Sequence, residues 1–210
     1  LVMIERSANL TSIAIEREQA LEEIRRLAYH DSLTKLPNRR LMSERLHLAM
    51  ATSQRTGLPG ALMVLDLDNF KPLNDEHGHA AGDLLLREVA ERLTGSLRET
   101  DTVARLGGDE FVIVVGGLDA DPARAADQAL SIATHIAAVL ARPYRLAIHP
   151  DEGAPAVIEH LCSASIGVAL FAGKDLSEQE LIKRADMAMY QAKEAGRHTV
   201  RVFAATPSSA

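Results

Sequence analysis

The sequence predicts an α/β fold, more strictly α+β, in which helices cover a mixed sheet. Three observations support this prediction. Short apolar runs with the character of strands alternate with longer stretches that carry a helical stripe, and two of the strands are close enough in sequence to form a hairpin. A chain of 210 residues with 47% hydrophobic content can also bury one substantial core. Strands that alternate with helices, with one hairpin among them, are typical of a mixed sheet packed against helices.

From Pro37 onward, the expected order is helix, strand, helix, hairpin, helix, strand, helix and strand. The first helix occupies roughly residues 38–54 and ends before the segment Gly57-Leu58-Pro59-Gly60. A continuous apolar run at residues 61–65 has the length of a strand that is buried on both faces. After Asp83 an apolar stripe predicts the next helix, and its members are Leu86, Val89, Ala90, Leu93 and Leu97.

The second half of the chain contains recognisable helix boundaries. Asp121-Pro122 is a favourable N-cap and N1 pair for the next helix, which should stop before residue 143. Residues 143–162 are rich in proline and should form an extended, hairpin-like excursion. Ser177 and Glu180 have the spacing of a capping box for the last long helix, and Gly196 can end it.

Apolar residues near the start of the chain follow alternating four- and three-residue steps, which is the spacing of a coiled coil. They are Leu10, Ala14, Leu21, Ile24 and Ala28, with Arg17 interrupting the series between Ala14 and Leu21, and charged residues fill much of the remainder. Two interpretations stay open for a helix over residues 8–28. It packs on its own domain, or it pairs in parallel with a second copy and links an upstream domain to the rest. We favour pairing, although three or four heptads are normally needed to establish it.

Charge and cysteine content narrow the classes of partner and compartment. The net charge of −6 argues against a general binder of nucleic acids or anionic membranes. Cys162 is the only cysteine, so no disulfide framework exists and a reducing compartment, the cytoplasm, is expected. No apolar run approaches the ~20 residues of a membrane helix, and no signal peptide is visible. Because Leu1 is not an initiator methionine, we expect a piece of a longer protein, whose other parts could attach it to a membrane.

The predicted hairpin has an unusual tip. Its strands, at Val103-Ala104 and Phe111–Val115, enclose the segment Gly107-Gly108-Asp109-Glu110. Glycines let backbone N–H groups approach a bulky anion, and adjacent carboxylates hold a hard cation through oxygen. The combination favours a site for a phosphate ester with its metal, and an ordinary acidic hairpin turn is the alternative for this segment taken alone.

A second acidic element follows the apolar run at residues 61–65. Asp66 and Asp68 have the period-two spacing that places both on one face of a strand. A carboxylate at the end of a buried strand is costly unless it is paired or bound to metal. The polar and glycine residues that follow are Asn74, Asp75, His77, Gly78, His79, Gly82 and Asp83. This is more than a solvated loop requires, so we expect a second half of the same site.

Five blocks of the sequence together resemble a known family. They are Asp31–Arg39, Asp66–Asp83, Gly107–Phe111, Ser165–Ala169 and Ala185–Arg197. In this order they resemble the motifs of a GGDEF domain of the diguanylate cyclase family, which makes cyclic di-GMP from two GTP molecules. The resemblance implies a central five-stranded sheet like the palm of nucleotidyl cyclases. It divides the chain into a signalling or linker helix at residues 1–28, a GGDEF domain at 29–203 and a flexible tail or linker at 204–210.

The resemblance also implies a site for Mg²⁺, with Mn²⁺ as an alternative. The expected ligands are Asp66, Asp109 and the backbone carbonyl of Leu67. Asp109 is further expected to help remove the proton of the attacking 3′-hydroxyl. Glu110 is the second catalytic residue of the motif, with its role left open. For Asp68, a bracing role at the turn and a role in the site stay equally open.

Eight residues are implied as GTP contacts. Asp83 matches the position that accepts from the N1–H and N2–H₂ edge of guanine, and Asn74 the position that donates to O6 or N7. Gly107 and Gly108 would pass close under the triphosphate. The remaining contacts are Phe70 and the phosphate-binding residues Lys71, Lys193 and Arg197. Lys193 and Arg197 are four residues apart and are expected on one face of the last helix.

An inhibitory product site is implied by the R-x-x-D motif at Arg98 and Asp101. Its spacing from Gly107 matches that of the family. Arg98 would bind a guanine or phosphate of cyclic di-GMP, and Asp101 would accept from a guanine edge. A surface ion pair between the two residues is the alternative. A further basic residue is expected to complete the site, and Arg124 is a candidate.

Three functions are compatible with these motifs. The leading hypothesis is an active diguanylate cyclase that works as a homodimer, since each domain holds one GTP, and that cyclic di-GMP inhibits. The alternative is a non-catalytic module that binds GTP or cyclic di-GMP and regulates an attached domain. A palm-type enzyme with another nucleotide substrate requires Asn74 and Asp83 not to read guanine. By analogy, an upstream sensor domain and a downstream phosphodiesterase domain are expected in the full-length protein.

Overall fold

The computed structural model describes residues 17–18, 23–148, 156–173 and 176–204. Its centre is a five-stranded sheet with the strand order β2-β3-β1-β6-β7. The bounds are Gly60–Leu67 for β1, Thr102–Gly107 for β2, Glu110–Val115 for β3, Ala164–Phe171 for β6 and Val200–Val202 for β7. β6 and β7 pair in parallel, whereas the other neighbours are antiparallel. The predicted mixed five-stranded sheet is therefore confirmed.

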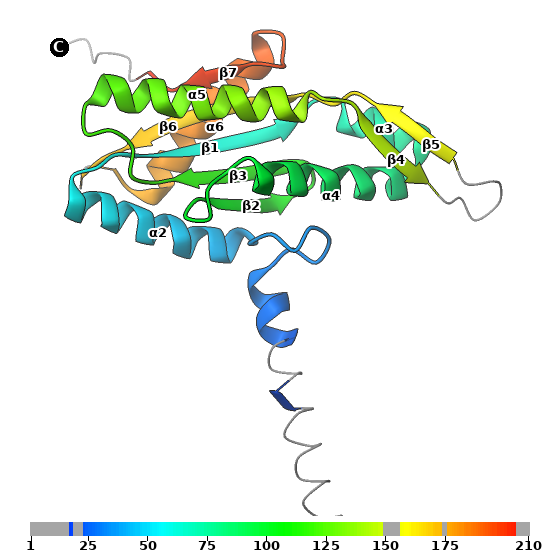
Figure 1. The fold of residues 1–210 in the computed structure, drawn as a ribbon, viewed down its shortest axis with the longest axis horizontal. Coiled ribbons are helices and arrows are strands. Elements are labelled where there is room, and N and C mark those ends of the chain that lie inside the picture. Colours follow the sequence, from blue (N-terminus) through cyan, green and yellow to red (C-terminus); the bar gives the residue numbers. More distant parts are fainter. Residues whose placement is uncertain (1–16, 19–22, 149–155, 174–175, 205–210) are drawn as a thin grey trace, which may run out of the picture.

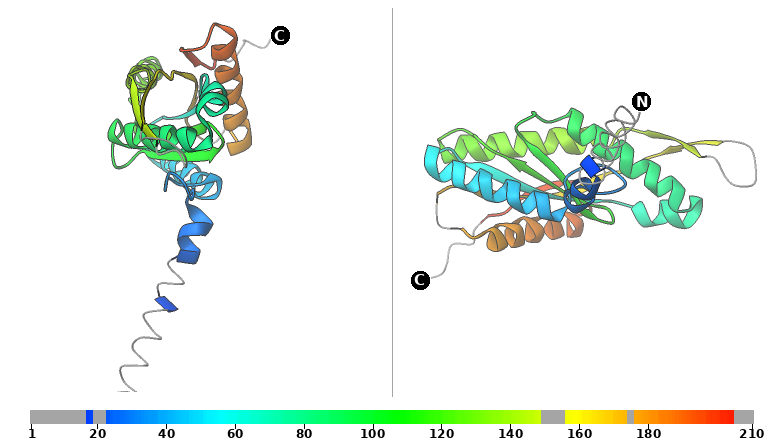
Figure 2. Two further views of the ribbon diagram at one scale, coloured as in Figure 1. Left: turned by 90° about the vertical axis from the view of Figure 1, so that its right-hand side faces the viewer. Right: turned by 90° about the horizontal axis from the view of Figure 1, so that it is seen from below.

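Helices cover both faces of this sheet (Figure 1, Figure 2). The helices are α2 (Arg39–Thr56) and α6 (Glu178–Glu194) on one face, and α4 (His79–Gly95) and α5 (Pro122–Leu140) on the other. β1 lies between the two layers. Leu62 and Val64 pack toward α2 and α6, whereas Met63 and Leu65 pack toward α4 and α5. The prediction of a strand buried on both faces is confirmed.

The segment between β1 and β2 contains two helices where the sequence predicted one. α3 (Phe70–His77) precedes α4, and Asp83 lies inside α4 rather than before it, so the predicted start of this helix was wrong. Gly78, with φ 79°, separates the two helices. The buried positions Leu73 and Ala81 are too widely spaced among polar residues to reveal the helical period in the sequence.

The other predicted helix boundaries are confirmed by their caps. The Asp121 side chain accepts from two backbone N–H groups in the first turn of α5, and the Ser177 side chain accepts from one at the start of α6. α5 ends before residue 143, and α6 ends at Glu194, just before Gly196. The capping residues therefore set where both helices begin.

The excursion predicted at residues 143–162 contains a two-stranded antiparallel hairpin, which projects from one end of the body (Figure 1). Its strands are β4 (Tyr144–Ile148) and β5 (Ala156–His160). Arg92 of α4 donates to the backbone carbonyls of Arg142 (2.7 Å) and Pro143 (2.8 Å). Its guanidinium carbon also lies 3.6 Å from the centroid of the Tyr144 ring. The base of the hairpin is thus held on α4.

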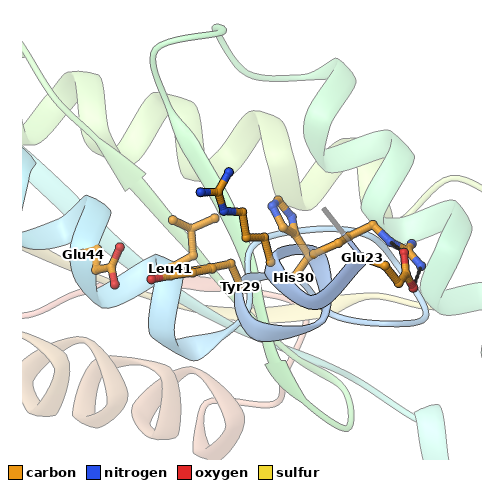
Figure 3. Close-up of a pocket in the computed structure, with 7 residues that line it drawn as sticks. Glu23, Tyr29, His30, Leu41 and Glu44 are labelled. Atoms are coloured by element: carbon orange, nitrogen blue, oxygen red, sulfur yellow. Dashed lines mark hydrogen bonds and ion pairs between the residues drawn. The ribbon is translucent and has the colours of Figure 1, made fainter. Parts of the chain in front are cut away.

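Residues 23–29 form a short helix that stands away from the body, below α2 in Figure 1. Ile24 and Leu27 are 62% and 57% exposed, which disfavours packing of this helix on its own domain. Its junction with α2 contains a hollow of about 560 Å³ with Glu23, Tyr29 and Leu41 in its lining (Figure 3). Apart from residues 17–18, the rest of the predicted helix lies outside the described residues, and its pairing stays a prediction. Within the described part of the chain, no helix combines the length and apolar content that a bilayer span requires.

Close packing at Gly167 sets the position of α6 on the sheet. A Cβ atom at this residue of β6 would overlap the backbone of Ala185 and Met189 in α6. Helix and strand therefore approach more closely than any side chain on β6 would allow. This glycine, which belongs to the block Ser165–Ala169, positions the helix that carries Lys193.

Arg105 of β2 connects the N-terminal segment to the tip of the β2–β3 hairpin. Its Nη1 donates to Asp31 Oδ1 at 2.9 Å, and its Nε and Nη2 donate to the carbonyl of Gly108 at 3.1 and 2.8 Å. The Arg105 side chain is 10% exposed. The segment that leads from the N-terminal helix to α2 is therefore in direct contact with the turn.

The same contacts keep Asp31 ionised. Burial opposes ionisation of this carboxyl, but hydrogen bonds from Thr34 and Arg105 outweigh burial and hold its pKa below the ordinary value of 3.8. A carboxylate whose pKa is lower in the folded than in the unfolded state stabilises the fold above that ordinary value. The stabilisation is lost as the pH falls through the folded-state pKa.

We therefore expect Asp31→Asn to lower the free energy of unfolding by about 1–2 kcal/mol at neutral pH, because charge-assisted hydrogen bonds are lost at a partly exposed site. The difference from the parent should shrink as the pH falls below about 4 and through the lowered pKa of the folded parent's carboxyl. Urea unfolding at several pH values measures both effects. Asp127→Asn, at an exposed position of α5, is the control and should change little. A difference that stays constant down to about pH 3 would contradict the role of the Asp31 charge.

Candidate functional site

The end of β1 and the tip of the β2–β3 hairpin meet in the sheet. Asp66 of β1 lies opposite Glu110 of β3 on one side and Ser165 of β6 on the other. The backbone N–H of Leu67 donates to the carbonyl of Asp109 at 3.2 Å. The two acidic elements of the sequence are therefore adjacent in the sheet, and they are candidates for one site.

The hairpin tip is a tight turn whose backbone needs glycine. Gly107 pairs with Glu110, and the register shifts between Arg105 and Gly107. Gly107 and Gly108 have φ values of 142° and 53°, in the region that favours glycine. No atom lies within 4 Å of a Cβ built at either residue, so open space borders both. The conformation and the free space suit close approach of a bulky anion.

The surroundings of Asp66 disfavour the charged form of its carboxylate. Burial raises its pKa above the ordinary value, and the nearby charge of Asp109 adds to this effect. Lys193 acts in the opposite direction, because its Nζ lies 2.7 Å from Asp66 Oδ2. The Asp66 side chain is 14% exposed. A largely buried carboxylate beside a second one favours a nearby cation, and Lys193 supplies that positive charge.

A divalent cation fits this arrangement. Across the described residues, no cluster of three or more His, Cys, Asp or Glu side chains is arranged to hold a metal by itself. Mg²⁺ is commonly held by one or two carboxylates and completes its shell with water and substrate phosphates. The ligands expected from the sequence, Asp66, Asp109 and the Leu67 carbonyl, offer only oxygen atoms, which suits this ion. The contact between Lys193 and Asp66 indicates that the position accepts positive charge.

Asp68 lies in different surroundings from Asp66, although only one residue separates them. It is 3% exposed, and its carboxylate accepts hydrogen bonds from the hydroxyls of Ser163 (2.6 Å) and Ser165 (2.8 Å). It also accepts from the backbone N–H of His198 at 3.0 Å. Of the two roles left open for Asp68, these contacts favour bracing.

The two residues predicted to read guanine lie on adjoining helices. Asn74 is on α3, and its Oδ1 is buried without a hydrogen-bond partner among the described residues. A Cβ atom at Gly82 of α4 would overlap this oxygen, so a side chain at residue 82 would displace the Asn74 amide from its present position. The next residue, Asp83, is exposed. Asn74 and Asp83 are therefore brought near each other, with an unused polar atom between the helices.

The predicted phosphate-binding residues come from two parts of the chain. Lys71 is exposed in the first turn of α3, next to the partly buried Phe70. Lys193 is in the last turn of α6, but Arg197 lies beyond the end of that helix, with φ 63°. The prediction that both lie on one helical face was wrong. The helix ends before Gly196, and the Arg197 N–H turns back to the carbonyl of Ala192 at 3.1 Å.

Arg98 and Asp101 form a turn rather than an ion pair. Asp101 Oδ2 accepts from the backbone N–H of Arg98 at 3.2 Å, and the Asp101 N–H donates to the Arg98 carbonyl at 3.0 Å. Burial raises the pKa of Asp101, against a smaller opposing effect of Arg98. The exposed Arg98 residue is thus left free of an ion pair to Asp101 in the described contacts. Both residues precede β2 and lie at the opposite end of that strand from Gly107.

Arg98 lines a cavity of about 440 Å³ against α2. Arg45 of α2 lines the same cavity, as does Ser53, whose Oγ is buried without a hydrogen-bond partner within the described structure. Arg124 does not belong to this lining, and its Nη1 lies 4.0 Å from Asp119. Arg45 is therefore the basic residue that the structure brings to Arg98, in place of the candidate Arg124.

Sequence reasoning missed Arg45 and Arg105. Arg45 gave no signal, because an arginine on the polar face of a helix is ordinarily a solvated residue. Arg105 stands two residues before a two-glycine turn, and a donor that can reach the turn carbonyl was a usable signal. Its partner Asp31 belongs to a block that was recognised but was given no role.

Known proteins resemble this chain in sequence. Residues 28–199 match the family described as diguanylate cyclase, GGDEF domain. The chain is 41% identical over 191 residues to the bifunctional diguanylate cyclase/cyclic di-GMP phosphodiesterase MucR of Pseudomonas aeruginosa, covering 91% of this chain and 26% of that protein. It is 42% identical over 175 residues to the diguanylate cyclase TpbB of the same species, covering 83% of this chain and 37% of TpbB. The chain therefore spans well under half of these relatives.

Solved structures extend the comparison to the fold. The coiled coil and GGDEF domain of DgcB from Caulobacter crescentus, in complex with c-di-GMP, matches with a TM-score of 0.78 and 27% identity, over 96% of this chain and 100% of that one. The GGDEF domain of TpbB matches with a TM-score of 0.70 and 38% identity, over 82% of this chain and 99% of that one. With the motifs, the sheet and the family match in agreement, this chain belongs to the GGDEF domain family of diguanylate cyclases.

Proposed function

We propose that the chain is an active diguanylate cyclase, which condenses two GTP molecules into cyclic di-GMP and two pyrophosphates. The observation that carries the proposal is the meeting of Asp66 with Asp109 and Glu110 beside the ammonium of Lys193. Phosphoryl transfer needs positioning and charge neutralisation more than it needs a covalent intermediate. Carboxylates, a lysine and an open glycine turn supply these requirements at one place. GTP as substrate also agrees with a cytoplasmic location.

The acidic residues have distinct proposed roles. Asp66, Asp109 and the Leu67 carbonyl would hold Mg²⁺, with Mn²⁺ as an alternative. When bound, the metal would offset the negative charge of the triphosphate. Asp109 would also take the proton of the 3′-hydroxyl, because its turn borders the free space over the glycines. Glu110, opposite Asp66 in the sheet, adds a further acidic group of the motif whose role we leave open.

The substrate is proposed to lie between the turn and the ends of α3, α4 and α6. Asn74 and Asp83 would bind guanine, since Asn74 keeps a buried oxygen without a partner and Asp83 is exposed beside it. Phe70 would border the base. The phosphates would pass over Gly107 and Gly108 and be bound by Lys71, Lys193 and Arg197. Lys193 would then exchange part of its contact with Asp66 for a phosphate.

Turnover of GTP with Mg²⁺ by this chain tests the proposal, and ATP is the matched control substrate. We expect cyclic di-GMP from GTP and no corresponding product from ATP. Binding of GTP without product would instead favour the regulatory module that controls an attached domain. Equal turnover of ATP would favour a palm-type enzyme with another substrate.

Asp109→Ala should abolish cyclic di-GMP synthesis, because it removes both a proposed metal ligand and the proposed proton acceptor. The fold should persist, since this residue lies in a turn that Arg105 holds through the Gly108 carbonyl. Product formation and circular dichroism measure the two effects. Asp127→Ala, at an exposed position of α5 outside the motif blocks, is the control and should keep the parent rate. Near-normal turnover by the Asp109 variant would exclude the assignment.

Catalysis is further proposed to require a homodimer, because each domain holds one GTP and the reaction joins two. The exposed Ile24 and Leu27 residues of the N-terminal helix support pairing through that helix. MucR is named as a bifunctional diguanylate cyclase/cyclic di-GMP phosphodiesterase, which supports a further phosphodiesterase domain in the full-length protein. An upstream sensor domain is also proposed, because the N-terminal helix would link such a domain to the GGDEF domain. No nucleic-acid partner is proposed.

Specific activity should therefore rise with protein concentration. Replacing Ile24 with Glu should lower it at a given concentration, because a charge in a pairing seam is costly. Rate measurements across a dilution series, with sedimentation to follow the dimer, check this expectation. Val157→Glu, at a similarly exposed position of β5 outside the N-terminal helix, serves as the control. Specific activity independent of concentration in both proteins would exclude the half-site arrangement.

Feedback inhibition by cyclic di-GMP is proposed at Arg98 and Asp101. Arg98 and Arg45 both line one cavity, and two basic residues at one cavity suit an anionic ligand with guanine edges. Because Asp101 binds the Arg98 backbone, the turn holds Arg98 at the mouth of the cavity without neutralising its side chain. The cavity and the Asp66 site lie at opposite ends of β2, so inhibition should not compete with GTP.

Arg98→Ala should weaken binding of cyclic di-GMP by about tenfold to a hundredfold, which corresponds to roughly 1.5–3 kcal/mol for each charge-assisted hydrogen bond lost. The variant should stay active at product concentrations that silence the parent, with GTP affinity little changed. Calorimetry with cyclic di-GMP and product-inhibition kinetics measure this. Arg124→Ala is the control, since that residue lies outside the cavity. Equal affinity in parent and Arg98 variant, or purely competitive inhibition of the parent, would overturn the proposal.

A further inference from the structure

The loop that follows α6 has an unusual backbone. Arg197 and His198 are consecutive residues with φ values of 63° and 47°, in the left-handed region. Side chains other than glycine, asparagine and aspartate rarely adopt this conformation, and each such residue costs on the order of 1 kcal/mol. Two in succession persist only where surrounding contacts hold them. The contacts that hold this loop therefore determine the backbone position from which the Arg197 side chain extends.

Two hydrogen bonds hold the loop from opposite sides. The Arg197 N–H donates to the carbonyl of Ala192 in α6 at 3.1 Å, and the His198 N–H donates to Asp68 Oδ2 at 3.0 Å. The chain then enters β7, next to β6, where Ile166 donates to the carbonyl of Thr199 at 3.0 Å. Asp68 supplies the only side-chain contact among these three.

The surroundings of Asp68 make its carboxylate a hydrogen-bond acceptor for several groups. Its carboxylate is 3% exposed and is bonded at Oδ1 by the Ser165 hydroxyl and at Oδ2 by the Ser163 hydroxyl and the His198 N–H. Within the described residues, it forms no ion pair with Lys or Arg. A buried carboxylate without a cation requires several directed donors, and donors held this way are fixed in place.

We propose that Asp68 is a positioning residue that fixes the loop carrying Arg197, so that its guanidinium lies ready for the substrate phosphates. This inference rests on the proposed function, which assigns Arg197 to phosphate binding. The carboxylates at the end of β1 would thereby position both basic side chains, Lys193 and Arg197. Asp66 contacts Lys193 directly, and Asp68 acts on Arg197 through the backbone of His198. Asp68 itself does not need to touch substrate or metal.

Affinity for 3′-deoxy-GTP with Mg²⁺ tests the proposal, because this analogue lacks the attacking hydroxyl and cannot react. Asp68→Ala should weaken binding roughly tenfold, the loss expected for one charge-assisted contact. Asp68→Asn should retain part of the affinity, since its amide oxygen can still accept from the His198 N–H while its NH₂ faces the Ser165 hydroxyl. Ser165→Ala is the matched control: it removes a bond to the same carboxylate but leaves the loop contact, and its affinity should stay near that of the parent.

A double-mutant cycle with Arg197→Ala separates positioning from a general loss of stability. If Asp68 acts through Arg197, then Asp68→Ala should cost little further affinity once Arg197 is removed. Equal losses in both backgrounds would overturn the proposal. If Arg197→Ala lowers the affinity but Asp68→Ala does not, the positioning role of Asp68 is overturned, whereas the proposed phosphate contact of Arg197 stands. No effect of Arg197→Ala would remove the phosphate contact from the proposed function, and the positioning role with it.

Hydrogen exchange of the backbone supplies a readout that does not depend on nucleotide. In the parent, the amide of His198 should exchange slowly for a residue in an exposed loop, because Asp68 holds it. Asp68→Ala should speed this exchange at least tenfold, whereas Ser165→Ala should leave it slow. Exchange of the parent amide at the rate of a free loop would overturn the proposal even if the Asp68 variants fail to fold.

Discussion

Carboxylates crowd the end of a strand that is buried on both faces, and the surrounding structure depends on how their charge is compensated. Burial and the neighbouring Asp109 both disfavour the charged form of Asp66, and Lys193 offsets them with an ion pair. Asp68, two residues later, receives hydroxyl and backbone donors instead. These requirements draw β6, the end of α6 and the following loop to one corner of the sheet. The same corner is where a metal and a triphosphate would find the charges they need.

The hairpin tip is fixed by a separate set of contacts. Gly107 and Gly108 adopt φ values that favour glycine, and Arg105 donates two hydrogen bonds to the Gly108 carbonyl. Since Asp31 holds the same guanidinium, the segment after the N-terminal helix touches the turn that carries Asp109. The N-terminal helix, the segment that follows it and the Gly107-Gly108 turn are thus linked through Asp31 and Arg105. A rearrangement of the helix has a direct physical route to the candidate site.

The proposed inhibitory site and the candidate active site lie at opposite ends of one strand. Arg98 and Asp101 precede β2, whereas Gly107 ends it. Coupling between two sites requires that a ligand bind one of two states more tightly, and separation alone does not supply it. The cavity beside Arg98 is lined by α2 as well, and α2 packs on the same face of the sheet as α6. Product bound there would contact both a strand and a helix of the core.

The sequence by itself determined the features that depend on local patterns. The apolar run of β1, the hairpin, and the caps at Asp121 and Ser177 are set by residues close together in the chain, so period and capping rules predicted them. The five motif blocks identified the family in the same way. Only the tertiary structure decided that α3 precedes α4, that Arg197 lies beyond α6, that Asp68 braces a loop, and that Arg45 shares a cavity with Arg98. Each of these depends on contacts between distant segments or on where packing ends a helix, and a local pattern contains no information about either.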